Sequence, residues 1–337
     1  MQSASERDSI LRWSPGSPRG HVESTFLKLN LVSRRQALWL KFTVLEPPPG
    51  HGDAQAAVWA IFFDVDHPER RRAVKRVMPA SDISWQADRF LLRFGDCEMA
   101  RGRSHGSVSG AGSIAWDLTW TTGEESFRHF PHDRMYELPL PRSKALSPTI
   151  DARFQGTVTV DGERIEVVEA PGMHGHNWGE NHAREWVWAH CNAFAEDGVV
   201  FEGLSARVAL GPITTPALTI LHLRTPVETV TFNRLRDLVA SASRQHGLYW
   251  SFEATGGPWR LRGVVHGSPD RFVGVDYHDP DGTVHHCLNS KVAVAELTLL
   301  RRHGATWSPY GQWRSDDSCA LEIGTCGDTH GVPILLP

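Results

Sequence analysis

The chain has 337 residues, of which 40% are hydrophobic and 22% charged, and its formal net charge is −4 at pH 7. This composition is typical of a globular protein and argues against a disordered one, and a length above the usual size of one hydrophobic core predicts two domains. So small a net charge gives no electrostatic reason to expect a nucleic acid or an anionic membrane as the main partner.

The cysteines and the N-terminal residues indicate a reducing compartment. The five cysteines are scattered and odd in number, and they lack C-x-x-C spacing, which predicts reduced structural thiols. Charges interrupt the first residues where a signal peptide needs an apolar core, and no stretch approaches the roughly 20 apolar residues of a membrane span. We therefore expect a cytoplasmic protein without a transmembrane segment. Transient membrane contact and the oligomeric state stay open.

The first half of the chain predicts a leader followed by strands. Residues 1–22 mix Ser, Pro, Gly and Arg without periodicity, which predicts a flexible leader. From Ser24 onward apolar and polar residues alternate with period two, as in residues 37–44, 57–64 and 113–120. Such alternation is the signature of half-buried β-strands.

The second half predicts further strands, separated by turns rich in Gly, Pro and Asp. They are expected at residues 185–194, 199–210, 217–224, 247–253, 259–266, 272–278, 283–289 and 292–301. Only residues 231–244 predict a helix. Many short strands at close spacing favour a sandwich or barrel over a parallel α/β sheet. We therefore expect an all-β protein with two antiparallel barrel domains, at residues 23–170 and 171–337.

The segment 185–194 has an unusual alternation. Its large side chains Trp186 and Trp188 share one face with His190, Asn192 and Phe194, and the opposite face carries only small residues. A core face normally avoids His and Asn, because buried polar groups need partners. This face therefore predicts a cavity wall with polar anchors. The alternative is a core strand whose polar groups bond to neighbouring backbone.

Other motifs give weaker signals. His174, His176 and His182 lack the helical H-x-x-x-H spacing of zinc hydrolases and have no specified carboxylate partner, so we expect no metal site. The basic run at residues 69–76 predicts a solvated strand edge. We find no Gly-rich phosphate loop, nucleophile elbow or dinucleotide fingerprint, which weakens the hydrolase, kinase and dehydrogenase interpretations.

The motif G-x-x-x-H-N-W-G at residues 172–179, with the Trp-x-Trp strand that follows, resembles the carotenoid hydratase (hydroxyneurosporene synthase) superfamily. Tocopherol cyclases and certain fungal Diels–Alderases are more distant relatives. Matching pieces cover nearly the whole chain, at residues 26–30, 38–42, 59–64, 114–118, 210–216 and 320–324. The resemblance implies two tandem lipocalin-like barrels. It also implies chemistry on apolar substrates without an organic cofactor, by hydration, cyclisation or pericyclic closure.

Two classes of function fit this resemblance. The first is a cofactor-independent hydratase, cyclase or isomerase that binds an isoprenoid, polyene or polyketide in a barrel cavity. The second is a non-catalytic carrier or sensor of a hydrophobic molecule. Protonating an alkene needs an acid in a dry site, where burial raises the pKa of a carboxyl toward neutrality, whereas a pericyclic enzyme needs only to hold its substrate in a reactive shape.

The candidate site residues follow from these two classes. The candidate proton donors are Asp117, Glu202 and His190. Asp117 lies on the strand face opposite Trp116. The candidate substrate-binding residues, which are mostly aromatic, are Trp116, His176, Asn177, Trp178, Trp186, Trp188, Asn192 and Phe194.

Overall fold

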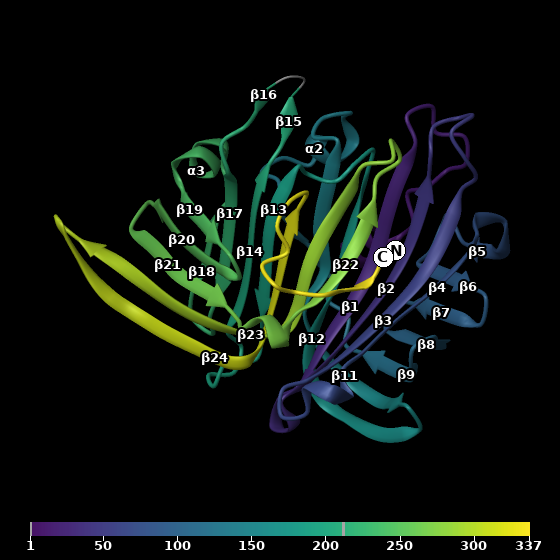
Figure 1. Ribbon diagram of the computed structural model, residues 1–337. Coiled ribbons are helices and arrows are strands. Elements are labelled where there is room, and N and C mark those ends of the chain that lie inside the picture. The colour runs from purple at the N-terminus through teal and green to yellow at the C-terminus, as the bar shows by residue number, and fades with distance from the viewer. Residues whose placement is uncertain (1, 211–212) are drawn as a thin grey trace.

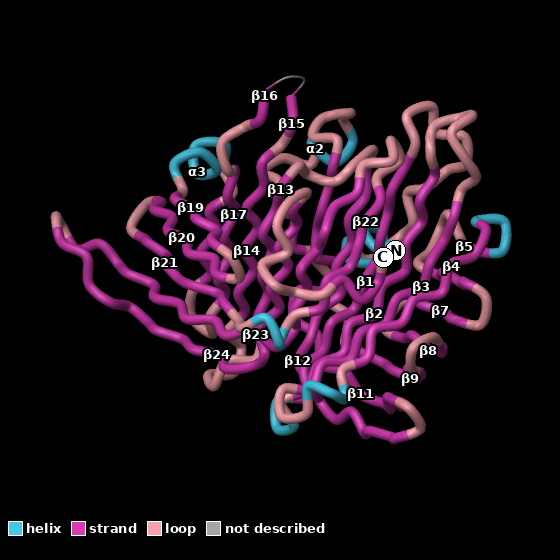
Figure 2. The backbone as a smooth tube through the Cα atoms, in the orientation of Figure 1, coloured by secondary structure: helices cyan, strands magenta, loops and turns pink. Residues whose placement is uncertain are grey.

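The structure is a computed structural model that describes residues 2–210 and 213–337. Two large, strongly curved antiparallel sheets lie side by side, one built from the first half of the chain and one from the second (Figure 1). Strands dominate the backbone trace, and the helices are short (Figure 2). The predicted all-β class with two antiparallel barrels is therefore confirmed.

The first sheet has twelve strands in the order β4-β3-β2-β1-β12-β11-β9-β8-β7-β6-β5, with β10 paired to β11. Its strands are β1 (His21–Leu31), β2 (Gln36–Glu46), β3 (Gln55–Asp64), β4 (Arg72–Pro79), β5 (Ile83–Trp85), β6 (Leu91–Phe94), β7 (Cys97–Ala100), β8 (Arg103–Ser109), β9 (Ser113–Trp120), β10 (Phe127–Arg128), β11 (Ser143–Val160) and β12 (Glu163–Gly179).

The second sheet follows the order β18-β17-β14-β13-β24-β23-β21-β20-β19, with β22 paired to β23 and β25 paired to β22. Its strands are β13 (Glu185–Cys191), β14 (Val200–Arg207), β17 (Leu218–Arg224), β18 (Thr229–Phe232), β19 (Ala242–His246), β20 (Tyr249–Gly256), β21 (Trp259–His266), β22 (Val273–His278), β23 (Val284–His303), β24 (Thr306–Thr325) and β25 (Ile334–Leu336). A separate pair joins β15 (Ala209–Leu210) to β16 (Ile213–Thr214). Gly211 and Pro212, part of one matching piece, lie outside the described residues.

The α-helices are α1 (Ala4–Ser9), α2 (Arg134–Glu137) and α3 (Leu235–Ala240). Short 3₁₀ turns lie at Val32–Arg34, Pro68–Arg70, Ala80–Asp82 and Pro269–Arg271. The predicted helix at residues 231–244 covers α3 but also the end of β18 and the start of β19. No helix of the described residues is long and apolar enough to cross a membrane.

The segment expected to be a flexible leader packs against the first barrel. Ser3 caps α1 by accepting a hydrogen bond from the Glu6 backbone N–H at 3.1 Å. Leu11 and Trp13 are buried in the core of the first barrel. Their apolar side chains tie the segment down, which composition alone did not indicate.

Strand β12 runs through the predicted boundary at residues 170/171. It stays paired with β1 as far as Gly179, and the chain enters the second sheet at Glu185. Gly172 and Gly175, just after the predicted boundary, lie inside β12. A side chain at Gly172 would collide with Phe154 and the Lys28 backbone, and one at Gly175 would collide with the Phe26 ring. The glycines therefore serve close packing within the strand.

Each barrel has its own apolar core, and a third apolar cluster joins the outer faces of the two sheets. On β1, Leu27 and Leu29 point into the first barrel, while Phe26 packs outward. The cluster between the sheets includes Trp39 from the first half and Tyr277 from the second. Each strand has two faces, and many strands bury one face in a barrel core and the other at the contact between the sheets. Cavities at that contact are therefore lined by both halves of the chain.

Candidate functional site

A cavity of about 210 Å³ lies between the two sheets and is lined mainly by apolar side chains of both halves. We call it the aromatic pocket. Trp186 and Trp188 of β13 form part of its wall, and Phe26 of β1 stands edge-on to Trp188 with ring centres 5.6 Å apart. Leu204 of β14 lies on the same wall. The predicted grouping of the two tryptophans beside a cavity therefore matches the geometry.

The aromatic pocket lies between the barrels, whereas we expected it inside one. Val187, Ala189 and Cys191 occupy the interior of the second barrel, where they belong to its core. The alternation of β13 then turns Trp186 and Trp188 outward, toward the first sheet. Small residues on the inner face leave room for the bulky core side chains of other strands.

Glu202 carries the main charge at this pocket. It lies on β14, and its side chain is 1% exposed. The carboxylate accepts hydrogen bonds from Trp188 Nε1 at 2.9 Å and from Ser147 Oγ, which lies 2.9 Å from both of its oxygens. His129 Nε2 is 3.0 Å from Oε1. Glu202 and Trp188 come from the second sheet, and Ser147 and His129 from the first half of the chain.

The hydrogen bonds of His129 require a proton between its ring and Glu202. His129 Nδ1 lies 3.0 Å from the carbonyl oxygen of Ala145, which can only accept, so Nδ1 carries a hydrogen. Nε2 faces a carboxylate oxygen, which also accepts unless it is itself protonated. A second proton must therefore lie on Nε2 or on Oε1. The pair is a buried Brønsted acid, with one proton to give, at the wall of an apolar pocket.

The pKa of Glu202 decides where that proton lies. Burial raises the pKa of this carboxyl, but His129, His190 and the hydrogen bond from Trp188 together outweigh burial and lower it from 4.5 to about 2. Our expectation that burial raises the pKa of the acid toward neutrality is wrong at Glu202. The carboxylate is therefore ionised at pH 7 and is the acceptor in its contact with His129 Nε2.

His190, a second candidate donor, lies outside the aromatic pocket, stacked beside Trp188 with ring centres 6.2 Å apart. Its Nε2 donates to the carbonyl oxygen of Ile150 at 2.7 Å, and its Nδ1 has no partner among the described residues. Burial, helped by the charge of Lys28, lowers the pKa of His190 to about 3. The imidazole is therefore neutral at pH 7, and its one N–H hydrogen is bonded to Ile150, so it is not an acid at this pH.

Asp117, the third candidate donor, is at the surface. Its side chain is 66% exposed, and its nearest cation is Arg103, at 3.9 Å. Trp116, on the opposite face of β9, is buried in the first barrel and donates from Nε1 to Ser104 Oγ at 2.9 Å. The structure brings neither residue to the aromatic pocket.

The remaining substrate-binding candidates divide into two groups. His176 and Asn177 line the aromatic pocket. Trp178 lies next to it and packs on the His176 ring at 4.8 Å. Asn192 donates to Asp151 and to the Gly172 carbonyl oxygen, and Phe194 belongs to the core of the second barrel.

The three histidines considered for a metal site go to different surroundings. His174 stacks on Phe90 inside the first barrel, and His176 bonds Glu23 through Nε2 at 2.7 Å. His182, in the link between the sheets, bonds Asp279 at 2.6 Å. Among residues 2–210 and 213–337, no group of three or more His, Cys, Asp or Glu side chains is arranged to hold a metal ion.

Sequence reasoning missed His129 and Ser147. His129 follows the two-residue strand β10, in a segment without clear periodicity, and it is 73 positions from Glu202. Neither spacing nor alternation connects the two residues. Arg207, which lies on β14 with Glu202, pairs instead with Glu185 at the surface.

Comparison with known proteins places this fold and pocket in a family. The family model described as tocopherol cyclase-like matches residues 149–325, more than half of the chain. The chain belongs to the tocopherol cyclase-like family. The match spans β12, β13 and β14, and so includes Trp186, Trp188 and Glu202. His129 lies before the matched segment.

Relatives of similar length have no assigned activity. Uncharacterised proteins from two strains of Mycobacterium tuberculosis are 26% identical over 312 residues, which cover 90% of this chain and 87% of theirs. An Oryza sativa subsp. japonica protein assigned as a chloroplastic tocopherol cyclase is 42% identical, but over 55 residues, 16% of this chain and 10% of that protein.

Two solved structures share the fold. A Nitrosomonas europaea protein assigned as AttH superposes with a TM-score of 0.57 at 12% identity, covering 94% of this chain and 99% of that one. The structure of CghA with Sch210972 superposes with a TM-score of 0.50 at 12% identity, covering 92% and 90%. At such low identity these likenesses establish the fold alone.

Proposed function

We propose that the protein is a cyclase-type enzyme that acts, without an organic cofactor, on an apolar isoprenoid, polyene or polyketide bound in the aromatic pocket. Membership of the tocopherol cyclase-like family supports the reaction class. The observation that carries the proposal is the protonated His129–Glu202 pair at the wall of an otherwise apolar pocket. An apolar ligand needs no such buried acid for binding, whereas the protonation of an alkene does.

In the proposed reaction the proton that bridges His129 Nε2 and Glu202 Oε1 is transferred to one carbon of a substrate alkene. The other alkene carbon becomes a cation, which the faces of Trp186 and Trp188 stabilise by about 0.5–2 kcal/mol each. A second double bond or a hydroxyl of the same substrate then attacks the cation and closes the ring. Loss of a proton from the closed product returns His129 to its starting state, so the overall reaction is an isomerisation.

Glu202 has a positioning role in this scheme. Its carboxylate fixes the His129 ring through Nε2 and keeps the imidazole charged before the substrate is protonated. The N–H of Trp188 and the hydroxyl of Ser147 hold the carboxylate in place. The apolar wall excludes water and so favours ring closure of the cation. If water captured the cation instead, the enzyme would be a hydratase.

The experiment is turnover in D₂O with a panel of prenylated phenols and linear polyenes, followed by mass spectrometry. A cyclase of this kind converts a panel member to an isomer that carries one non-exchangeable deuterium. His129→Gln and Glu202→Gln should reduce the rate at least 100-fold while substrate binding persists. Glu166→Gln, an exposed carboxylate on β12, is the matched control and should keep full activity.

Two results would point away from this proposal. An isomer without deuterium would indicate pericyclic closure, in which the pocket only holds the substrate in a reactive shape. Tight binding of panel members that are always returned unchanged would indicate the non-catalytic carrier.

A further inference from the structure

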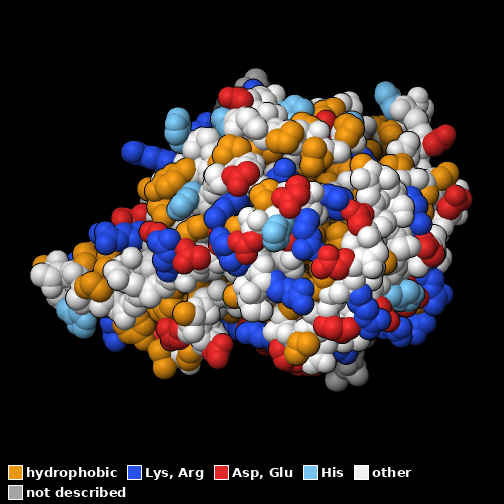
Figure 3. Space-filling model, turned by 60° about the horizontal axis from the view of Figure 1, so that its bottom comes forward, with side chains coloured by type: hydrophobic (Ala, Val, Ile, Leu, Met, Phe, Trp, Pro, Cys, Tyr) orange, Lys and Arg blue, Asp and Glu red, His pale blue; other side chains and the backbone are white. Residues whose placement is uncertain are grey.

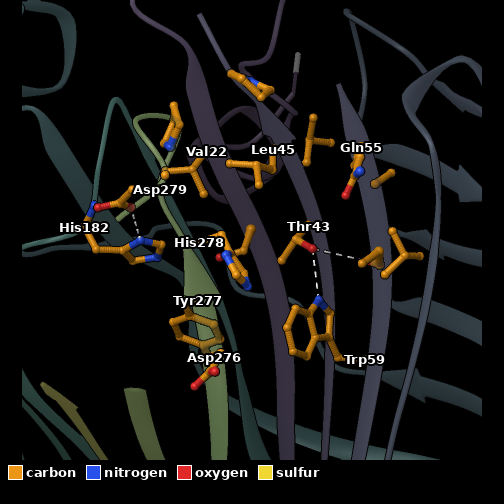
Figure 4. A pocket seen from close by; sticks show the side chains of 18 of the residues that line it. Val22, Thr43, Leu45, Gln55, Trp59, His182, Asp276, Tyr277, His278 and Asp279 are labelled. Atoms are coloured by element: carbon orange, nitrogen blue, oxygen red, sulfur yellow. Dashed lines mark hydrogen bonds and ion pairs between the residues drawn. The ribbon is translucent and has the colours of Figure 1, made fainter. Parts of the chain in front are cut away.

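A second cavity, of about 420 Å³, lies between the outer face of β1–β4 and the end of β22 (Figure 4). We call it the lysine pocket. Trp59 and Tyr277 form two of its walls, with Val22 and Leu45 nearer one end. The proposed cyclase reaction makes no use of this cavity, which has a mostly apolar lining and about twice the volume of the aromatic pocket.

Lys41 is the unusual residue of this pocket. It lies on the outer face of β2, between Trp39 and Thr43, and is only 4% exposed. Its Nζ is 3.5 Å from the centre of the Tyr277 ring. Among residues 2–210 and 213–337, no hydrogen bond or ion pair joins this ammonium group to a protein acceptor. Its three donors therefore face the pocket beside one aromatic ring.

The carboxylates near Lys41 already have other partners. Glu322 accepts from Lys291 Nζ at 2.7 Å. Asp276 pairs with His286 at 2.7 Å. Asp279 accepts from His182 and from His285, at 2.6 and 3.0 Å. The positive charge of Lys41 is therefore left without a counter-ion, although burial of an unpaired charge is costly.

A neighbouring lysine shows the contrast. Lys75 also lines the pocket, over the Trp59 ring at 4.0 Å, but its Nζ donates to the Pro337 carbonyl oxygen at 3.0 Å. On the face seen in Figure 3, Lys and Arg side chains are interspersed with Asp and Glu side chains at the surface. Lys41 has neither a carbonyl partner nor that exposure.

We propose that the lysine pocket binds a small molecule with an apolar body and one carboxylate, and that this carboxylate pairs with Lys41. A carboxylate supplies the acceptors that the ammonium lacks, and the lining of Trp59, Val22 and Leu45 accommodates the apolar body. The contact with Tyr277 holds the ammonium group in place before the ligand arrives. Burial lowers the pKa of Lys41, but only to about 8, so its charge is present at pH 7. This site is independent of the proposed cyclase reaction.

The test uses the 337-residue chain and isothermal titration calorimetry with dodecanoate, 1-dodecanol and acetate, each below any micellar range. Dodecanoate should bind at least tenfold more tightly than 1-dodecanol, and acetate should not bind measurably. Lys41→Met should abolish the preference for dodecanoate over the alcohol, while the control Arg164→Met, which removes an exposed cation outside the pocket, should keep it. Ala57→Trp, which fills the pocket, should weaken both long-chain ligands at least tenfold.

Thermal melting provides a second readout that does not depend on affinity. Lys41→Met removes an unpaired buried charge and should melt at or above the temperature of the natural chain. Dodecanoate should raise the melting temperature of the natural chain but not that of Lys41→Met. Equal affinity for dodecanoate and 1-dodecanol, or an acid preference that survives Lys41→Met, would overturn the proposal.

Discussion

Replacing Glu202 with Gln tests the buried acid most directly. Gln has nearly the same shape, so the packing around it should be kept. The amide can donate to His129 Nε2, because Ala145 keeps the hydrogen of His129 on Nδ1, and its oxygen can still accept from Ser147. Trp188 Nε1 shares Oε1 with His129 and therefore loses its acceptor when the amide nitrogen takes that position. The substitution removes the charge of the pair, its transferable proton and the hydrogen bond from Trp188.

The expected loss of stability follows from the pKa of Glu202. A pKa lowered from 4.5 to about 2 corresponds to roughly 3 kcal/mol of folding free energy at pH 7. Because the pKa in the folded state lies below that of the unfolded chain, this stabilisation is fully present above pH 4.5 and is lost as the pH falls through 2. Glu202→Gln should lower the free energy of unfolding by about 3 kcal/mol at pH 7 and by about half as much at pH 3.

The assay is urea-induced unfolding followed by tryptophan fluorescence at both pH values. Glu166→Gln, whose side chain is exposed, should change the free energy of unfolding by less than about 0.5 kcal/mol. A loss below about 1 kcal/mol for Glu202→Gln at pH 7, or an equal loss at both pH values, would refute the charged pair.

Three further substitutions address the rest of the site. Trp188→Phe should keep the fold but remove one hydrogen-bond donor to the Glu202 carboxylate. The free energy of unfolding in urea should fall by about 1.5–3 kcal/mol. A loss near zero would show that this bond does not form. Asp117→Asn should leave turnover unchanged and stability within about 0.5 kcal/mol, because the side chain is 66% exposed; a large loss of turnover would restore Asp117 as a donor. Gly324→Ala places a methyl group against the Trp186 ring. It should therefore lower the melting temperature and weaken ligand binding in the aromatic pocket. Unchanged binding would show that Trp186 can move aside without changing the pocket.

The sequence alone determined the strands and which side chains share a strand face. Successive residues of a strand point to opposite sides, so the grouping of Trp186 with Trp188, and the placing of Asp117 opposite Trp116, needed only local chain geometry. Glu202 was also named from the sequence as a candidate proton donor, and its carboxyl is buried on β14.

Only the tertiary structure decided what those faces meet. The period of a strand does not say which face is turned inward, so the two tryptophans line a pocket between the barrels and not inside one. The partner of Glu202 is 73 positions away in a segment without periodicity, and its positive charge reverses the pKa shift that burial alone produces. Contacts and charges at such separations in the chain depend on how both sheets curve and pack, and no local pattern of residues records that.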